Sequence, residues 1–430
     1  MKNNKQKAAA YLLSPGLLLS MSACSAPLPE TDATTATATT TTAEAVAATT
    51  EKTEETTTMT EAAEPFVLNE PITDAMYSRA VLNSGSRARL AAVFNRAKRG
   101  EEITIGYIGG SITQGSSAKS SDNSYVMRNF EWWVENVTEN IDMRNAGIGA
   151  TDSYVGVHRV DKDLLAYSPD VVIVEFSVND TRPLVNKNSY DSLVRKILSS
   201  PDRPAVILLI TTMEDGTSLQ DIHKEIGLAY DLPIISYHDA ILPETASSAI
   251  KWSDISPDNI HPNDEGHRIV AELLNRYLED AFAEADDFSG EPADFTAEPL
   301  TKDIYADARI ANSESIAPTE NEDFYDSDKM PQFKGGWTSD VGGRLVFEVE
   351  ARSFGIMFYR TTDGKSGKYD VLVDGERKST VDGDFTGGWG NFADTKQVFS
   401  GGEAAPHTIE IRPAEGSEDK GITILGLMIS

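Results

Sequence analysis

The sequence predicts a three-layer α/β/α sandwich built on a parallel sheet, followed by an all-β domain of β-sandwich, jelly-roll-like type. Short β-branched runs alternate with helical stretches between residues 70 and 287, which is the order of parallel crossover units. After about residue 332, many glycines separate short alternating runs with no helix between them. Because 430 residues exceed what one core supports, we expect two domains, at 70–287 and 300–430.

Residues 1–24 have the features of a bacterial export signal. Three lysines precede a short apolar run, 11–21, and small residues lead to Cys24. Cys24 is the only cysteine, so no intrachain disulfide can form. The segment resembles a lipobox, which implies cleavage before Cys24 and lipidation there, although Met21 replaces the commoner leucine. A plain signal peptide with an incidental cysteine is the alternative.

Residues 25–64 are mostly Thr, Ala and Glu, and they offer too little apolar surface to offset the entropy of ordering. We expect a disordered tether and a secreted protein, lipid-anchored at the bacterial cell surface. The formal charge of −30 argues against a nucleic-acid partner, because an acidic surface repels phosphate.

The α/β region contains five strand candidates and five helix candidates. The strand candidates are 103–108, 141–145, 171–176, 206–211 and 233–236, and the helix candidates are 125–135, 154–165, 190–198, 219–229 and 265–282. In a parallel sheet of this kind the ligand site lies at the carboxyl ends of the strands. We therefore expect the functional residues directly after strands.

The C-terminal region contains six further strand candidates. They are 344–351, 354–359, 368–373, 397–400, 407–411 and 422–429. Asp374-Gly375 between two of these runs is typical of a two-residue hairpin turn.

Four short segments carry side chains suited to catalysis. They are 109–113 (GGSIT), 145–153 (NAGIGATDS), 175–180 (EFSVND) and 258–262 (DNIHP). Serine needs an adjacent base to act as a nucleophile, and the base needs a third group that fixes its tautomer. An Asp three residues before a His on a turn can bend back to the ring.

These segments, in this order, resemble the four sequence blocks of the SGNH (GDSL-like) hydrolase superfamily. The resemblance covers about residues 100–284. It implies that Ser111 is the nucleophile, His261 the general base and Asp258 the group that orients the imidazole. Gly110 stands where the family often has Asp, and Ser177 where it often has Gly.

The resemblance also implies an oxyanion hole made of the Ser111 amide, an amide of the Gly149-Ala150 turn and the Asn179 side chain. Alignment of the second segment places the turn amide on either Gly149 or Ala150, and both remain open.

Two alternatives to these assignments come from the neighbouring sequence. His267 is close to His261 but has no Asp three residues upstream, and Asp254 is an alternative to Asp258 as the orienting group. The histidines lack the spacing of metal ligands, and no glycine-rich phosphate loop is complete. We expect neither a metal nor a cofactor.

The whole arrangement resembles bacterial carbohydrate esterases with an accessory β-sandwich domain. That resemblance implies removal of acetyl or other small acyl groups from cell-wall polysaccharide such as xylan or mannan. Trp252 is a candidate for stacking on a sugar, and Trp337 and Trp389 are candidates in the C-terminal domain, which either binds glycan or forms part of the cleft. For each aromatic ring, packing is the alternative.

Three other functions compete with this interpretation. A lipase or thioesterase should show an apolar acyl channel or lid, and the sequence has no such apolar stretch. A glycan O-acyltransferase would use the same site. A surface glycan-binding lipoprotein with a vestigial hydrolase domain is the alternative from another class, and the intact catalytic set argues against it.

Overall fold

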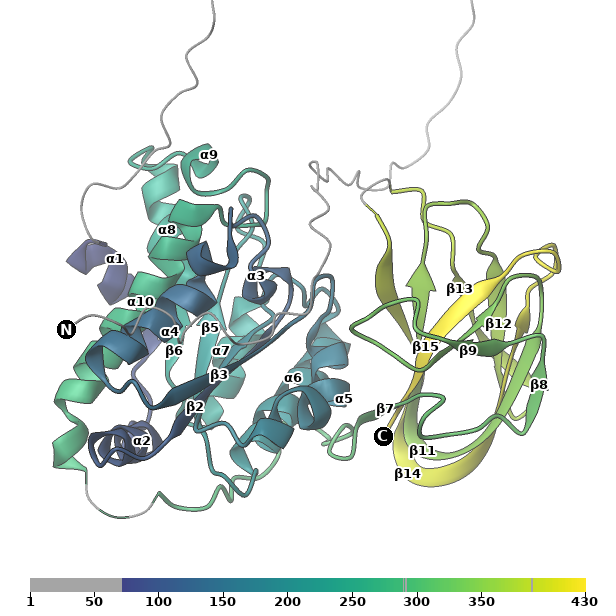
Figure 1. The fold of residues 1–430 in the computed structure, drawn as a ribbon, viewed down its shortest axis with the longest axis horizontal. Coiled ribbons are helices and arrows are strands. Elements are labelled where there is room, and N and C mark those ends of the chain that lie inside the picture. Colours follow the sequence, from purple (N-terminus) through teal and green to yellow (C-terminus); the bar gives the residue numbers. More distant parts are fainter. Residues whose placement is uncertain (1–71, 289, 291, 388–389) are drawn as a thin grey trace, which may run out of the picture.

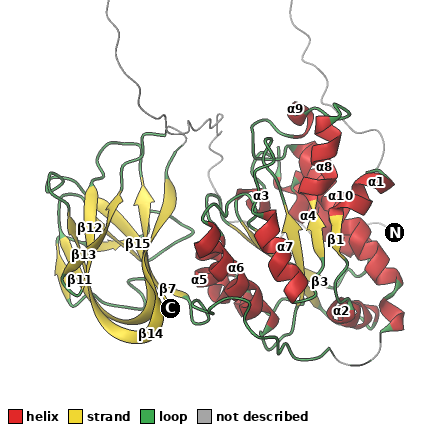
Figure 2. Ribbon diagram, turned by 180° about the vertical axis from the view of Figure 1, so that it is seen from behind, coloured by secondary structure: helices red, strands yellow, loops and turns green. Residues whose placement is uncertain are grey.

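The computed structural model describes residues 72–288, 290, 292–387 and 390–430, which form two domains side by side (Figure 1). The first is an α/β domain and the second consists of strands, as Figure 2 shows by colour. The two predicted fold classes are therefore confirmed. The predicted anchor site Cys24, the predicted tether and Trp389 lie outside the described residues.

All helices of the described residues lie in the first domain. They are α1 (Asp74–Ala80), α2 (Ala88–Lys98), α3 (Ser111–Gln114), α4 (Tyr125–Asn136), α5 (Ser153–Asp163), α6 (Pro183–Leu198), α7 (Gln220–Ala229), α8 (Tyr237–Ala246), α9 (Trp252–Ile255) and α10 (Asp264–Ala283), with the short 3₁₀ turns η2 (Ser121–Asn123), η3 (Leu165–Tyr167) and η4 (Ala285–Asp287).

The α/β sheet has the strand order β1-β6-β5-β4-β2-β3. Its strands are β1 (Val81–Asn83), β2 (Ile103–Gly109), β3 (Ile141–Gly147), β4 (Val171–Glu175), β5 (Ala205–Ile210) and β6 (Ile234–Ser236). All neighbours pair in parallel except β1, which runs antiparallel to β6 at the edge. The strand order reverses between β2 and β4, and in such sheets a ligand crevice opens at this point.

Helices cover both faces of the sheet, because successive strand residues point to opposite sides. In β4, Val171 and Ile173 join the core beneath α1, α2, α4, α8 and α10. Val172 and Val174 join the core beneath α5, α6 and α7. This produces the predicted three layers.

The five predicted strands of the sheet are present, each within two residues of its expected ends. Sequence analysis assigned no element to residues 74–102, where the structure has α1, β1 and α2. The apolar spacing of Leu90, Val93, Phe94 and Ala97 is that of an amphipathic helix and would have revealed α2. Helix α6 begins at Pro183, earlier than expected, because proline is favoured at the first helical position.

The C-terminal domain is one antiparallel sheet that folds over itself. Its strands are β7 (Arg309–Ala311), β8 (Glu320–Glu322), β9 (Tyr325–Ser327), β10 (Gly336–Ser339), β11 (Arg344–Arg360), β12 (Lys368–Val373), β13 (Glu376–Asp382), β14 (Phe392–Pro413) and β15 (Ile422–Ile429). The first half of β11 pairs with β8 and its second half with β15, while β14 follows it along its whole length. Apolar residues from both halves form one core between the two layers.

One detail predicted for this domain is confirmed and another is wrong. Asp374 and Gly375 both have positive φ and join β12 to β13 in the predicted two-residue turn. The four strands expected at 344–359 and 397–411 are two long ones, because a bulge between Ala351 and Ser353 bends β11 instead of ending it.

The two domains share a hydrophobic core. Helix α5 buries every residue from Ser153 to Val160, because its inner face lies on the sheet and its outer face against the β domain. Tyr154 of α5 contacts Tyr305 edge to face, with ring centroids 5.5 Å apart, and Met357 and Met428 of β11 and β15 belong to the same cluster. The β domain therefore packs on the α/β domain through a shared core.

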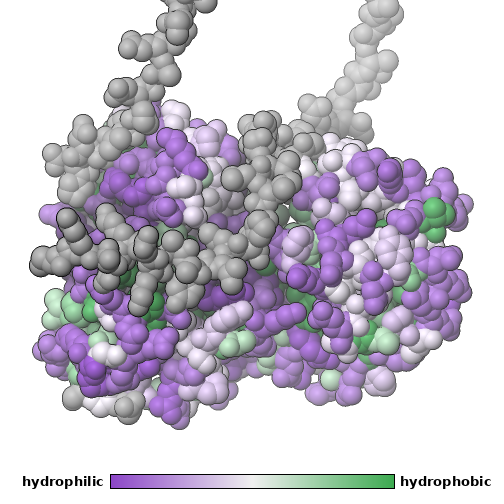
Figure 3. Space-filling model, in the orientation of Figure 1, coloured by the Kyte–Doolittle hydropathy of each residue, from purple (hydrophilic) through white to green (hydrophobic). Residues whose placement is uncertain are grey.

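None of the helices in the described part of the chain is both long and apolar enough to cross a bilayer. The face drawn in Figure 3 is mainly hydrophilic. The large apolar side chains that are exposed lie on separate elements, as Leu184 on α6, Leu228 on α7 and Tyr167 on η3 do.

Candidate active site

The candidate nucleophile lies on a tight turn at the carboxyl end of β2. Ser111 is the first residue of the one-turn helix α3, so its N–H has no partner inside the helix. Gly110 precedes it, and the Asn179 side chain from the end of β4 lies directly against the Gly110 Cα, where any Cβ would overlap it. The family's usual Asp at position 110 therefore could not be placed here without moving Asn179.

Three side chains from two distant segments meet beside this turn. His261 Nε2 lies 2.9 Å from Ser111 Oγ. His261 Nδ1 lies 2.8 Å from Asp258 Oδ2. The histidine and the aspartate side chains are 19% and 18% exposed, so a substrate can reach the site while most of the pair is shielded from water. The structure thus brings together the serine, base and orienting carboxylate expected from the sequence.

The loop between α9 and α10 holds the Asp258–His261 pair in place. Asp258 Oδ1 accepts hydrogen bonds from the N–H groups of Ile260 and His261, both at 2.7 Å. Partial burial alone would raise the pKa of Asp258, but hydrogen bonds from the His261 ring and these two amides outweigh it and lower the pKa to about 2. Asp258 is therefore ionised throughout the working range and can stabilise an imidazolium at His261.

The Gly149-Ala150 turn presents one free amide near Ser111. The Gly149 N–H donates to Gln114 Oε1 at 2.6 Å. The Ala150 N–H has no acceptor among the residues that the structure describes. Ala150 has a φ of 59°, a conformation that costs an alanine energy and is found mostly where surrounding structure enforces it. Of the two amides left open by the sequence, that of Ala150 is the one available to an oxyanion.

The Asn179 side chain is the third donor expected from the sequence. Its Oδ1 is buried and has no hydrogen-bond partner in the described part of the chain. The Nδ2 group donates to no atom of the described residues either, and it is not among the buried unpartnered atoms, so it is accessible to a ligand.

The competing residues lie elsewhere or have other partners. His267 is fully buried, where its Nδ1 accepts from the Tyr125 N–H and its Nε2 faces the Ser116 carbonyl, and burial lowers its pKa to about 4. Asp254 Oδ2 accepts from the Lys251 N–H and does not contact His261. The other histidines have partners elsewhere, namely Tyr154 for His158, Asp180 for His223, Asp239 for His238 and Asp374 for His407.

The aromatic candidates for sugar stacking have different outcomes. The prediction that Trp337 stacks on a sugar is wrong, because this residue lies on β10, is 1% exposed and packs against Phe347 in the domain core. Trp252 is partly exposed, and its Nε1 donates to the Asp258 carbonyl at 2.7 Å, so it braces the catalytic loop. A stacking role for Trp252 stays a prediction.

Gln114 is a site residue that sequence analysis missed. It lies three residues after Ser111 on α3 and ties that helix to the Gly149-Ala150 turn. Its position one helical turn from the nucleophile was the available signal. An exposed polar side chain gives no further hint of its partner.

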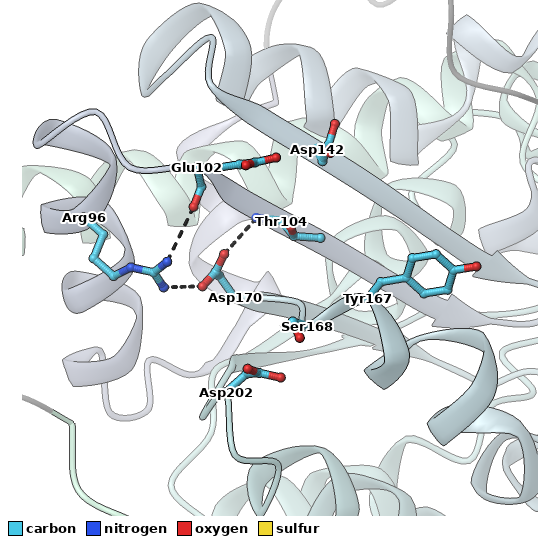
Figure 4. Close-up of a pocket in the computed structure, with 8 residues that line it drawn as sticks. All are labelled: Arg96, Glu102, Thr104, Asp142, Tyr167, Ser168, Asp170 and Asp202. Carbon is cyan, nitrogen blue, oxygen red and sulfur yellow. Dashed lines mark hydrogen bonds and ion pairs between the residues drawn. The ribbon is translucent and has the colours of Figure 1, made fainter.

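A polar depression of about 440 Å³ lies far from this chemistry. Figure 4 shows Arg96 joined to Asp170 and to the Glu102 carbonyl, with Asp170 also accepting from the Thr104 N–H. These residues surround the amino ends of β2 and β4, at the edge of the sheet opposite Ser111. Arg96 and Asp170 are engaged in fixing the strand ends, and we assign this depression no catalytic role.

Comparison with known proteins agrees with this geometry. Residues 107–269 match the model of the GDSL-like Lipase/Acylhydrolase family. A solved two-domain esterase (CEX) active on acetylated mannans superposes with a TM-score of 0.76 at 32% identity, covering 82% of this chain and 98% of that chain. A structure of such an esterase co-crystallised with mannopentaose gives 0.75 at 31% identity, covering 82% and 97%. No protein among the curated sequences matches.

We expect Ser111→Ala and His261→Ala each to lower kcat on p-nitrophenyl acetate by a factor on the order of 10⁶, because nucleophile and base act as a unit. Asp258→Ala should cost less, about 10⁴, since the carboxylate orients and stabilises without exchanging the proton. Asp254→Ala is the matched control and should stay near wild type. Comparable hydrolysis by the Ser111 or His261 variant, with folding checked by circular dichroism, would contradict the assignment.

We expect kcat/KM to fall on acidification while Asp258 is still ionised, because a base that is already protonated cannot accept the serine proton. Asp258 cannot cause this fall, since its pKa of about 2 keeps it ionised until far lower pH. Initial rates on an uncharged ester check this. A rate that is flat to about pH 4 and falls only where Asp258 titrates would exclude a histidine base.

Proposed function

From the premise that this chain belongs to the GDSL-like lipase/acylhydrolase family, we propose that this hydrolase removes acetyl groups from a polysaccharide, with mannan and xylan as the candidate backbones. The contact between His261 Nε2 and Ser111 Oγ carries the chemical part of the proposal. The shared two-domain architecture, which extends over nearly the whole of an esterase active on acetylated mannans, supports the substrate class.

The first half of the reaction transfers the acetyl group to the enzyme. Ser111 Oγ attacks the ester carbonyl carbon while its proton passes to His261 Nε2. The carbonyl oxygen becomes an oxyanion and accepts hydrogen bonds from the N–H groups of Ser111 and Ala150 and from the Asn179 amide. Asp258 stabilises the imidazolium. As the tetrahedral intermediate collapses, His261 gives its proton to the departing sugar oxygen, which leaves as a hydroxyl.

The second half regenerates the enzyme. A water molecule enters, His261 takes one of its protons, and the hydroxide formed attacks the acetyl-serine carbonyl. The same three donors stabilise the second oxyanion, and removing one such donor typically costs about 10²–10³ in kcat. Acetic acid leaves and the proton returns from His261 to Ser111 Oγ.

A panel of substrates tests the proposal. We expect acetate release from acetylated manno- or xylo-oligosaccharides with a kcat/KM at least about tenfold above that on long-chain p-nitrophenyl esters, because the exposed large apolar side chains of the described residues are scattered over separate elements. Ser111→Ala is the control. A preference for long-chain esters would favour a lipase, and transfer of acetyl to another glycan without acetate release would favour an acyltransferase.

We propose further that the protein is exported and anchored by lipid on Cys24. The support is the signal-like segment 1–24 and the tether composition of 25–64. Cys24→Ala should move activity from the membrane fraction to the medium with kcat unchanged, because several acyl chains are needed for firm membrane binding and Cys24 would carry them. A Cys24→Ala protein that is exported yet stays in the membrane fraction would place the anchor elsewhere.

A further inference from the structure

Glu175, at the start of the 175–180 segment, is a buried carboxylate that the mechanism above does not use. It is the last residue of β4 and its side chain is fully buried. Burial of an ionised carboxylate is expensive unless hydrogen bonds or a cation compensate. No ion pair joins it to a cation in the part of the chain that the structure describes. Its surroundings must therefore supply donors.

Three donors do so, and two of them belong to the nucleophile turn. The Thr113 hydroxyl donates to Glu175 Oε2 at 3.1 Å, and the Gly110 N–H faces the carboxylate and lowers its pKa. The Thr211 hydroxyl donates to Oε1 at 2.7 Å from the end of β5. Gly110 and Thr113 lie on either side of Ser111 in the chain. The carboxylate thus holds the turn from beneath at two points.

The hydroxyl groups around Glu175 are oriented by it. The single proton of Thr113 Oγ1 is directed to the carboxylate, so the Tyr125 hydroxyl, 2.8 Å away, donates to Thr113 Oγ1. On the other side, Ser177 Oγ accepts from the Thr211 N–H at 2.7 Å. The carboxylate therefore orders a small network reaching from α4 to β5.

The ionised Glu175 side chain does not stabilise the folded protein at neutral pH. Burial raises the pKa of Glu175 to about 7, against the bonds from Thr211 and Thr113, and the nearby Asp180 raises it further. Because the folded pKa exceeds the usual value near 4.5, the contribution to stability is present at low pH and is lost as pH rises toward 7. The titratable groups facing Glu175 are Asp180, Tyr125 and Tyr190, and none is a cation.

We propose that Glu175 is a positioning residue for ester hydrolysis, which clamps Gly110 and Thr113 and so keeps Ser111 Oγ within reach of His261 Nε2. A carboxylate suits this task because its two oxygens accept from both sides at once. The side-chain amide of a glutamine has only one acceptor oxygen. Its NH₂ group would face the donors on the other side. The proposal rests on Ser111 being the nucleophile, as argued above, and is independent of the polysaccharide.

The test compares Glu175→Leu and Glu175→Gln with wild type on p-nitrophenyl acetate, with melting temperatures at pH 8. We expect Glu175→Leu to lower kcat about 10²-fold with KM within twofold, the size of effect that a misplaced reacting group produces. Glu175→Gln should restore part of kcat, since its oxygen can still accept from Gly110 and Thr113. Its melting temperature should be no lower than that of wild type.

The matched control is Asp191→Asn. Asp191, on α6, is another fully buried carboxylate. It accepts hydrogen bonds from the hydroxyl groups of Tyr230 and Thr301 and lies away from the nucleophile turn. Its variant should lose stability and keep kcat. An equal loss of kcat in Asp191→Asn would mean that weakening the domain anywhere has this effect, and the proposal would fail.

Thr113→Val decides the matter if Glu175→Leu does not fold, because it removes one of the two contacts to the turn and keeps the carboxylate. A fall in kcat at unchanged KM supports the clamp. Unchanged kcat in Thr113→Val, or in a folded Glu175→Leu, overturns it. Wild-type protein that fails to hydrolyse the ester at all would instead count against the proposed function.

Discussion

The reversal of strand order between β2 and β4 is the constraint on which the site depends. Chain segments that leave these two strands diverge to opposite faces, and the crevice between them receives Ser111 after β2 and Asn179 after β4. His261 arrives from 150 residues away, on the loop before α10. Because only the sheet brings these segments together, the catalytic geometry is a property of the whole α/β core and not of any one motif.

Helix α5 contacts both the strand ends that carry the site and the second domain. Its buried Arg159 donates to the Gly109 carbonyl at 3.1 Å and to the Ala146 carbonyl at 2.7 Å, just before the nucleophile turn and the Gly149-Ala150 turn. The outer face of the same helix is covered by the β domain. The β domain therefore helps to hold the surface from which both turns project, whatever it contributes to glycan binding. Removing it would expose apolar residues beside the active site.

Much of this organisation could be predicted from sequence, and the failures have physical causes. Strands buried on both faces are continuous apolar runs, so the sequence predicted the parallel sheet. The edge strand β1 has only three residues, which is too short to show a pattern. Trp337 stands beside Gly335-Gly336, which suggested a loop, but Gly336 lies close against the β15 backbone within a sheet and the indole points inward. The resemblance of four segments to the SGNH sequence blocks pointed to Ser111, Asp258 and His261. The sequence could not show which of the Gly149 and Ala150 amides is free. That depends on the positive φ of Ala150, which is unusual for an alanine, and on the hydrogen bond from the Gly149 N–H to Gln114.

The central claim is that one serine, activated by His261, performs the chemistry. Treatment with a fluorophosphonate, followed by mass spectrometry of the intact protein and its peptides, tests this, because such reagents phosphonylate a serine that an adjacent base activates, with loss of fluoride. The account predicts one adduct per chain, on the peptide containing Ser111, and its absence in His261→Ala. An adduct on another serine with loss of activity, or full activity after Ser111 is blocked, would contradict it.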